Sequence, residues 1–397
     1  MKLTLAYLLT VAAAVAAARP ARACGGGVVS TQNTSIGANA QRIVLSVHDG
    51  VTDVVTQVGV PQTTADYGLL IPVPSEPTLD PNPVSSADID KLFEWSQPRV
   101  RVRPEVDDDI LPHCGCGSAS KGGGTGGTQV GAPVTIGPVT AMTLTGDTGG
   151  AVNTWLADNG FVLNLSYQSI IDDYSGPGRY FIVIRRSDTA ATGAPSSVGV
   201  HFTLAGDERG LPLRFAYIGS GDHVGFTVLV AADQVVGPSA PFQALTLDDL
   251  DAGALRTSYY SALATAVQSR SGLAFVLEGA WTGAELSAAG TWPSLQPFIR
   301  STQQVTRLSS VIREYDLSGF DTDVRFDQPF AGTVPRERIV QRSSRHPKLA
   351  FAWGVRASAR VGKGDNAGAR ADFAKFLELD PDAPNAGMAR KWLKDNP

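Results

Sequence analysis

The residues best suited to chemistry lie together in a glycine-rich stretch. His113, Cys114 and Cys116 bring one imidazole and two thiols within four residues. Thiolate and imidazole are ligands for Cu(I) and Zn²⁺. Structural zinc sites usually take four ligands from two separated pairs, and Cys24 is the only other cysteine that could supply a fourth. A metal site is therefore one interpretation of this stretch, and a disulfide or a free loop is the other.

The first 23 residues predict an exported protein. Lys2 gives a positive start, residues 3–18 form an uncharged apolar run, and Ala21 and Ala23 supply the small residues that signal peptidase needs. The run is shorter than the about 20 residues of a membrane-spanning helix. We expect cleavage between Ala23 and Cys24, and a periplasmic or secreted mature protein.

A cysteine directly after the cut raises a lipid anchor on Cys24 as an alternative. The charged Arg22 stands where that route expects a small residue, which disfavours it. Cleavage removes three basic residues and no acidic one, so the formal charge goes from −5 to −8. This balance argues against nucleic acid or an anionic membrane as the main partner. No later segment is long and apolar enough to span a bilayer.

The three cysteines predict one disulfide with one thiol left over. A disulfide requires Cα atoms roughly 4.4–6.8 Å apart, which the spacing of Cys114 and Cys116 allows only with strain. A bridge from Cys24 to Cys114 or to Cys116 is more comfortable. It would fix the mature N-terminus to the glycine-rich loop.

Other matches to reactive motifs are weak. Ser118–Lys121 fits a Ser-x-x-Lys pattern but lies in a tract without a rigid frame. Asp107–Asp109 lacks the spacing of a calcium loop. The five histidines are scattered, although a catalytic triad is assembled in space rather than in sequence. We therefore predict no catalytic residue and no cofactor.

Hydrophobic patterning predicts an α+β fold, with mainly antiparallel short strands and a few packed helices. Asp49-Gly50 marks a hairpin turn, Ser85 begins a helix, and Asn159-Gly160 ends one. We expect strands at 41–47, 51–60, 67–73, 100–106, 134–144, 180–186, 198–204, 213–218, 226–231, 273–277, 305–314 and 323–327. We expect helices at 86–95, 149–158, 168–174 and 248–268.

This pattern suggests five parts along the chain. They are a signal peptide at 1–23, a β-rich part at 24–110, a Cys/Gly-rich flexible loop at 111–132, an α+β part at 133–335 and a helical tail at 340–397.

An ordered set of short motifs carries a family resemblance. The motifs are Cys24-Gly25-Gly26, Ile71-Pro72-Val73-Pro74, a helix ending at Trp95, the run from Thr154 to Phe161, Tyr180-Phe181-Ile182-Val183 and Leu211-Pro212-Leu213-Arg214. Together they resemble the bacterial exported family known as domain of unknown function 2330, over roughly residues 24–330. The resemblance implies export and no agreed activity, so it transfers no catalytic residue.

The tail predicts helices at 346–361 and 366–379 and a third from 386. Trp353, Ala357, Ala369 and Phe373 fall on tetratricopeptide-repeat positions, and Phe376 to Pro381 resembles the end of such a repeat. About three repeats are needed for independent stability, so a single one should pack on the main domain or on a partner. Trp353, Phe373 and Phe376 are the candidate partner-binding residues.

These observations favour a non-catalytic binding or scaffolding protein of the cell envelope that meets a protein partner through its C-terminal helices. The alternative is a metal-dependent or hydrolytic enzyme with a site near the Cys114–Cys116 loop.

Overall fold

The protein is described by a computed structural model. It describes residues 27–30, 40–59, 64–65, 67–103, 120–121, 131–146, 148–161, 164–187, 197–341, 347–381, 383 and 385–396. These fall into two compact units. The first takes the described residues within 1–98, 112–249 and 263–336, and the second those within 99–111, 250–262 and 337–397. Helices and mostly antiparallel strands confirm the predicted α+β class.

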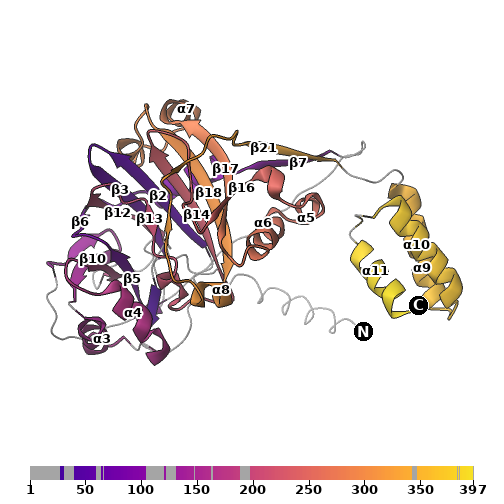
Figure 1. The fold of residues 1–397 in the computed structure, drawn as a ribbon, viewed down its shortest axis with the longest axis horizontal. Coiled ribbons are helices and arrows are strands. Elements are labelled where there is room, and N and C mark those ends of the chain that lie inside the picture. Colours follow the sequence, from indigo (N-terminus) through magenta and orange to yellow (C-terminus); the bar gives the residue numbers. More distant parts are fainter. Residues whose placement is uncertain are drawn as a thin grey trace, which may run out of the picture. The chain divides into compact units, whose positions relative to one another are not determined.

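An eight-stranded sheet forms the centre of the first unit (Figure 1). Most neighbours are antiparallel, but β14 pairs with β2 and β16 with β17 in parallel. In spatial order the strands are β16 (Gln243–Thr246), β17 (Ala274–Thr282), β18 (Gln304–Arg313), β14 (His223–Ala232), β2 (Ala40–His48), β3 (Val51–Gly59), β12 (Ser197–Ala205) and β6 (Thr78–Leu79).

The predicted hairpin joins β2 to β3. Asp49 and Gly50 both have positive φ angles, 49° and 77°. This is the backbone of a tight turn whose twist matches that of the flanking strands, and an Asp-Gly pair suits it. The pairing then sets Ser46 opposite Asp53 and Val44 opposite Val55.

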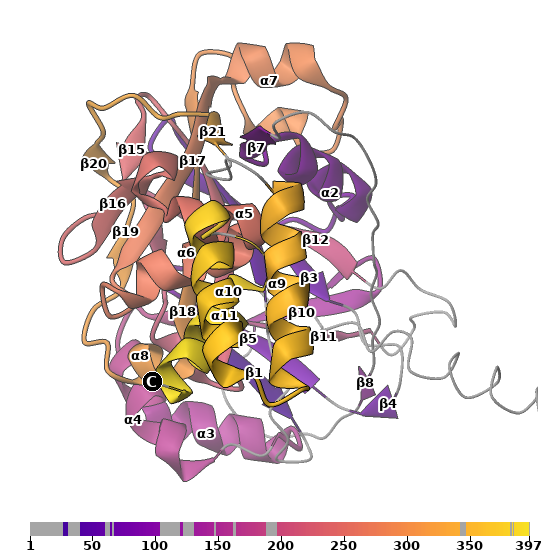
Figure 2. The ribbon, with the colours of Figure 1, turned by 90° about the vertical axis from the view of Figure 1, so that its right-hand side faces the viewer.

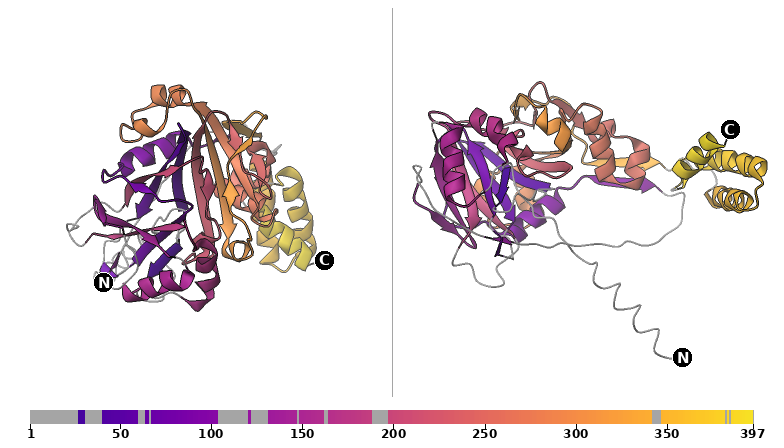
Figure 3. Two further views of the ribbon diagram at one scale, coloured as in Figure 1. Left: turned by 60° about the vertical axis from the view of Figure 1, so that its left-hand side comes forward. Right: turned by 90° about the horizontal axis from the view of Figure 1, so that it is seen from below.

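A five-stranded antiparallel sheet forms the second layer of this unit, in the order β1 (Gly27–Ser30), β5 (Tyr67–Val73), β11 (Tyr180–Arg186), β10 (Val139–Thr145) and β9 (Val134–Ile136). Helices α3 (Gly149–Asp158) and α4 (Gln168–Tyr174) share a core with one face of it, around Leu70, Phe181 and Val183. Both helices lie at the opposite end of this unit from α7 (Gly283–Ala289) (Figure 3).

Helix α2 (Ser86–Trp95) covers one face of the eight-stranded sheet. The Ser85 hydroxyl accepts from the Asp88 N–H at 3.3 Å, as the predicted cap requires. Ile89, Leu92 and Phe93 are buried in a core that also contains sheet residues and the α7 region. Trp95 packs against Trp281 and Trp292, with ring centroids 5.4 and 5.9 Å away.

Short elements complete the first unit. Two-stranded pairs join β13 (Gly210–Leu211) to β19 (Val324–Arg325), β15 (Val236–Gly237) to β20 (Gln328–Pro329), and β4 (Thr64–Ala65) to β8 (Ser120–Lys121). Further helices are α8 (Glu314–Ser318) and the 3₁₀ turns Leu165–Tyr167, Phe215–Tyr217, Leu247–Asp249 and Gln296–Phe298.

The second unit contains a parallel pair, β7 (Arg99–Arg103) with β21 (Glu337–Gln341), and helix α5 (Ala252–Thr257). It also contains three C-terminal helices: α9 (Pro347–Val361), α10 (Asn366–Leu379) and α11 (Ala386–Asp395). They lie side by side in Figure 2, and α10 contacts both others. These positions confirm the predicted helices of the tail.

Three predicted elements are wrong. Residues 213–218 contain the 3₁₀ turn Phe215–Tyr217 rather than a strand, because Phe215 and Ile218 fill the core beneath the five-stranded sheet. Residues 134–144 form the hairpin β9–β10, with Gly137 at φ 56° in its turn. The predicted helix 248–268 is broken at Ser258, which is extended and caps α6 (Tyr259–Gln268). No helix of the described ranges is both long and apolar enough to cross a bilayer.

Candidate functional site

The residues that the sequence singles out for metal or disulfide chemistry lie outside the described residues. This applies to Cys24, His113, Cys114 and Cys116, and to the cleavage site at Ala23. Among the residues that the structure does describe, no group of three or more His, Cys, Asp or Glu side chains is arranged to hold a metal ion.

The three partner-binding candidates lie in the hydrophobic core of the tail. Phe373 and Phe376 are 3% and 5% exposed, and Trp353 is half-buried against the same core. Phe351 and Val355, one helical turn apart on α9, are 67% and 53% exposed. In the folded tail, Phe351 and Val355 are therefore accessible from outside, whereas Phe373 and Phe376 are not.

A cavity of about 340 Å³ lies between the two main sheets of the first unit. This volume is within the range of about 300–1,000 Å³ that is typical of small-molecule sites. Strands β2, β3 and β12 form one wall, the end of β5 forms another, and β13 and β19 close it. Its apolar lining comprises Ile43, Leu45, Val54, Ile71, Pro72, Val73, Pro74, Phe202, Leu204, Leu211, Pro212 and Val324.

Strand alternation explains why this wall is apolar. Successive side chains of a strand point to opposite faces of the sheet. Val54 lies opposite Leu45 on β2 and opposite Phe202 on β12, so the three share the cavity face. Thr56 also lines the cavity, and its buried hydroxyl has no hydrogen-bond partner among the described residues.

The cavity has a half-buried polar pair in its wall. The Tyr174 hydroxyl lies 2.6 and 2.7 Å from the two carboxylate oxygens of Asp323, and the Arg214 N–H donates to the same carboxylate at 3.4 Å. Burial raises the pKa of Asp323, against these hydrogen bonds, which lower it. Burial and the nearby carboxylate also raise the pKa of Tyr174, so its hydroxyl stays a proton donor.

Charged side chains lie at the polar part of the lining. Arg325 binds Glu208 at 3.2 Å and Asp327 at 3.0 Å. Arg179 is exposed, and its guanidinium has no side-chain partner among the described residues. It is therefore the lining cation that a ligand can reach without breaking an ion pair.

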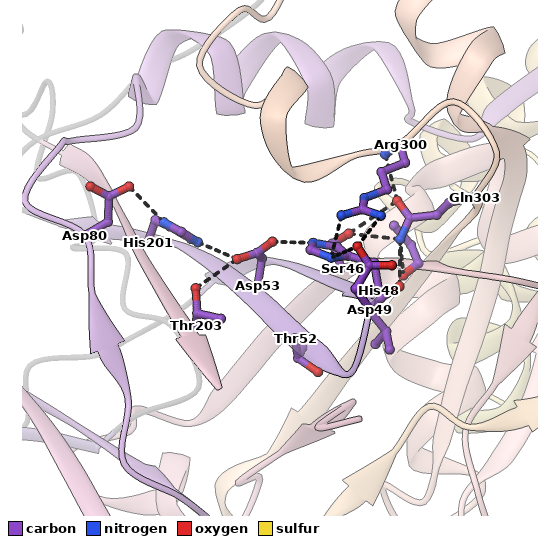
Figure 4. Close-up of polar contacts among 12 residues, drawn as sticks. Ser46, His48, Asp49, Thr52, Asp53, Asp80, His201, Thr203, Arg300 and Gln303 are labelled. Carbon is purple, nitrogen blue, oxygen red and sulfur yellow. Dashed lines mark hydrogen bonds and ion pairs between the residues drawn. The ribbon is translucent and has the colours of Figure 1, made fainter. Parts of the chain in front are cut away.

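The opposite face of the same strands carries a chain of polar contacts (Figure 4). The Asp80 carboxylate lies 3.0 Å from His201 Nδ1, and His201 Nε2 lies 2.9 Å from Asp53 Oδ1. Asp53 Oδ2 lies 2.6 Å from His48 Nε2, and the Arg300 guanidinium lies 3.0 Å from His48 Nδ1. Asp53 alone thus links two histidines that are far apart in the sequence.

His201 is cationic in this arrangement. Each ring nitrogen faces a carboxylate, and carboxylates only accept, so both nitrogens donate. Hydrogen bonds and charges of Asp53 and Asp80 raise the pKa of His201, although burial opposes them. Hydrogen bonds from the two histidines and Thr203 overcome burial and lower the pKa of Asp53 to about 2. Phe298 covers the His201 ring at a centroid distance of 4.2 Å.

Further contacts hold the end of this polar network that is formed by His48 and Arg300. Arg300 binds Asp49 in the β2–β3 turn at 2.7 Å. Gln303 donates to Ser46 at 3.1 Å and to the Val47 carbonyl at 2.9 Å. The Ser46 hydroxyl is thus engaged by Gln303 and the Thr203 hydroxyl by Asp53, and among the described residues neither is hydrogen-bonded to a histidine. This series of polar contacts can hold the strands and the turn together and keep its charged side chains in place. Its role is therefore to position these elements.

A family model, described as an uncharacterized protein conserved in bacteria (DUF2330), matches residues 18–235. This is more than half of the chain's 397 residues. The chain belongs to this family. The DUF2330 match confirms the family that the motifs suggested, and it covers the cavity lining as far as Pro212. Tetratricopeptide similarity of the tail is not among the matches. No curated protein and no solved structure matches the chain.

Sequence reasoning missed the cavity because its residues come from distant segments. Two motifs that carry the family resemblance, Ile71–Pro74 and Leu211-Pro212, lie in its wall. That they line a common space depends on the tertiary fold.

Proposed function

We propose that this member of the DUF2330 family is a non-catalytic binding protein whose ligand occupies the cavity between the two sheets. The observation that carries the proposal is the cavity itself. A space of about 340 Å³ with a mostly apolar lining and a few polar groups has the composition of a ligand site. Filling the cavity with an apolar ligand would remove the apolar surfaces of the cavity and of the ligand from water. This burial stabilises the complex by roughly 25 cal/mol per Å² of apolar surface.

Binding of a neutral fluorescent probe tests the proposal. We expect N-phenyl-1-naphthylamine to bind saturably with one site per chain and with enhanced fluorescence. Val54→Phe places a larger side chain on the cavity face and should weaken binding by about tenfold or more, which corresponds to about 1.4 kcal/mol.

Val55→Ile is the matched control, since Val55 adjoins Val54 but packs in the core on the opposite face of the sheet. It should leave probe binding unchanged. Thermal unfolding of each variant establishes that it is folded. Equal probe binding by wild type and a folded Val54→Phe variant would contradict the proposal.

We also propose that the protein is exported and acts in the cell envelope. The support is the signal-peptide pattern of residues 1–23. An enzyme with a site near Cys114 and Cys116 is the alternative, and those cysteines lie outside the described residues.

A protein partner at the C-terminal helices is a second candidate function. The supporting observation is the exposure of Phe351 and Val355 on one side of α9. Large apolar side chains grouped on a surface are characteristic of interaction sites. This proposal includes the hypothesis that the tail is a tetratricopeptide-like unit.

A further inference from the structure

We propose that the ligand of the cavity is an amphiphile with one anionic head group, whose apolar body fills the cavity and whose head group binds Arg179. The inference rests on the proposed function, because it requires that the cavity takes a ligand. It adds the chemical class of the ligand and the position of its head group.

The lining fits an apolar body. The wall formed by the eight-stranded sheet consists of Ile43, Leu45, Val54, Phe202 and Leu204, all less than 8% exposed, together with Thr56. Aliphatic and aromatic side chains bind alkyl groups without a preferred direction. The few polar groups of the lining must therefore determine which head group the ligand carries.

The Tyr174–Asp323 pair disfavours an anion within the cavity. The Tyr174 hydroxyl already donates its proton to Asp323, so both groups present only acceptor oxygens to a ligand. A ligand carboxylate has no proton to donate to them, and burying it unpaired is costly.

The same pair is a poor site for a cationic head group. Asp323 already accepts from the Tyr174 hydroxyl and from the Arg214 N–H. An ammonium group would have to lose its hydration inside the cavity and replace these donors.

Arg179 is the group that suits an anion. Neighbouring arginines are bound to carboxylates: Arg325 to Glu208 and Asp327, Arg209 to Asp207, and Arg214 to Asp173. Arg179 has no such partner among the described residues, and it lines the cavity from an exposed position. A guanidinium can bind a carboxylate or a phosphate through two parallel hydrogen bonds.

The test compares three ligands with the same chain: dodecanoate, 1-dodecanol and dodecylammonium. Each displaces N-phenyl-1-naphthylamine from the wild-type protein, from Arg179→Gln and from Lys91→Gln. Lys91 is an exposed cation on α2, which covers the opposite face of the sheet, so Lys91→Gln removes the same charge elsewhere.

We expect dodecanoate to bind the wild type more tightly than dodecanol, by up to about fivefold for a solvent-accessible ion pair. Dodecylammonium should bind most weakly. Arg179→Gln should abolish the difference between dodecanoate and dodecanol while leaving dodecanol affinity unchanged, and Lys91→Gln should keep the difference.

Equal affinity of the wild type for dodecanoate and dodecanol would overturn the inference while leaving cavity binding intact. Tightest binding of dodecylammonium would also overturn it, since the head group would then lie at Asp323. Failure of all three ligands and of the probe to bind would instead overturn the proposed function.

Discussion

His201 illustrates how single residues set the electrostatics of this protein. Its side chain is 9% exposed, and its two ring nitrogens lie 2.9 and 3.0 Å from Asp53 and Asp80. The imidazolium therefore links β3 and β12 to the segment that carries Asp80. Charge-assisted hydrogen bonds of this kind contribute roughly 1.5–3 kcal/mol each.

The first prediction concerns the pH dependence of stability. The pKa of His201 is raised, so its contribution is complete below the unfolded value of 6.5 and is lost as pH rises through the folded value. His201→Asn should therefore cost more free energy of unfolding at pH 6 than at pH 9, as measured by urea denaturation. Thr203→Val removes a donor to Asp53 without changing any charge, so its cost should be the same at both pH values.

At acid pH, Asp53 changes the stability in the opposite direction: its contribution is lost as the pH falls. The pKa of Asp53 falls from 3.8 to about 2, so its contribution is present above pH 4 and is lost as pH falls through 2. The shift corresponds to about 2 kcal/mol. The network is therefore strongest between about pH 4 and the folded pKa of His201. A His201→Asn cost that did not change between pH 6 and pH 9 would show that His201 is not held as a cation.

The sequence alone does not predict that these residues lie together. His201 belongs to a strand that was correctly predicted, and His48 lies one residue beyond the predicted strand 41–47, but their common partner Asp53 is 148 residues from His201. Tyr174, Arg179 and Asp323 are equally scattered. Alternation in a strand predicts which residues share a face, whereas the identity of the neighbouring strand depends on the tertiary fold.

At the scale of elements, local signals were reliable where turn chemistry supported them. Asp49-Gly50, the Ser85 cap and the Gly160 helix end all lie where the sequence placed them. The errors fell on short apolar runs such as 213–218, because such a run does not by itself distinguish a strand from other buried structure. The predicted strand 67–73 is β5, and it contains Pro72: beyond Leu70 the strand has no β1 partner and is an edge there, which tolerates proline.

A buried ion pair holds the end of α2 to the sheet. A β-bulge between Leu277 and Gly279 accommodates Glu278, which is 1% exposed and lies 2.5 Å from Arg307. Arg307 also donates to the Phe93 carbonyl at 2.7 Å and to Ser96 at 2.8 Å. It thereby adds a strong donor to a carbonyl in the last turn of α2, whose other hydrogen bond, from the Ser96 hydroxyl, is 3.5 Å long.

The second prediction follows from this burial. Arg307→Met leaves the Glu278 carboxylate buried without its cation and should lower the free energy of unfolding by about 3–5 kcal/mol. The double variant Arg307→Met/Glu278→Leu removes both charges and should be more stable than the single variant. Chemical denaturation measures both. A double variant less stable than Arg307→Met would show that the pair contributes more than it costs to bury.

At the scale of the whole molecule, the two units each have their own core. The cavity and the polar chain belong to the first unit, and the family match extends no further than residue 235. The tail has a separate core of Ala357, Phe373, Phe376, Leu379, Ala386 and Ala389. The sequence predicted its helices well because their hydrophobic spacing is local.

Arg356 and Arg360 occupy tail positions where the repeat pattern expects apolar residues, and the structure gives a reason. Asp372 on α10 is 1% exposed and binds Arg356 at 2.7 Å and Arg360 at 3.3 Å. Arg356 also lies over the Trp353 ring, 4.2 Å from its centroid. The two arginines therefore neutralise a buried carboxylate, which composition alone would not reveal.

The last prediction separates the tail from the cavity. Phe373→Ala removes a 3% exposed aromatic side chain from the tail core and should destabilise it by about 3–5 kcal/mol. Hydrogen exchange should therefore become faster across α9, α10 and α11. Phe351→Ala, at a 67% exposed position on α9, is the matched control and should leave exchange unchanged.

Because all lining residues belong to the first unit, both variants should bind N-phenyl-1-naphthylamine like the wild type. Loss of probe binding in Phe373→Ala would show instead that the folding of the two units is coupled.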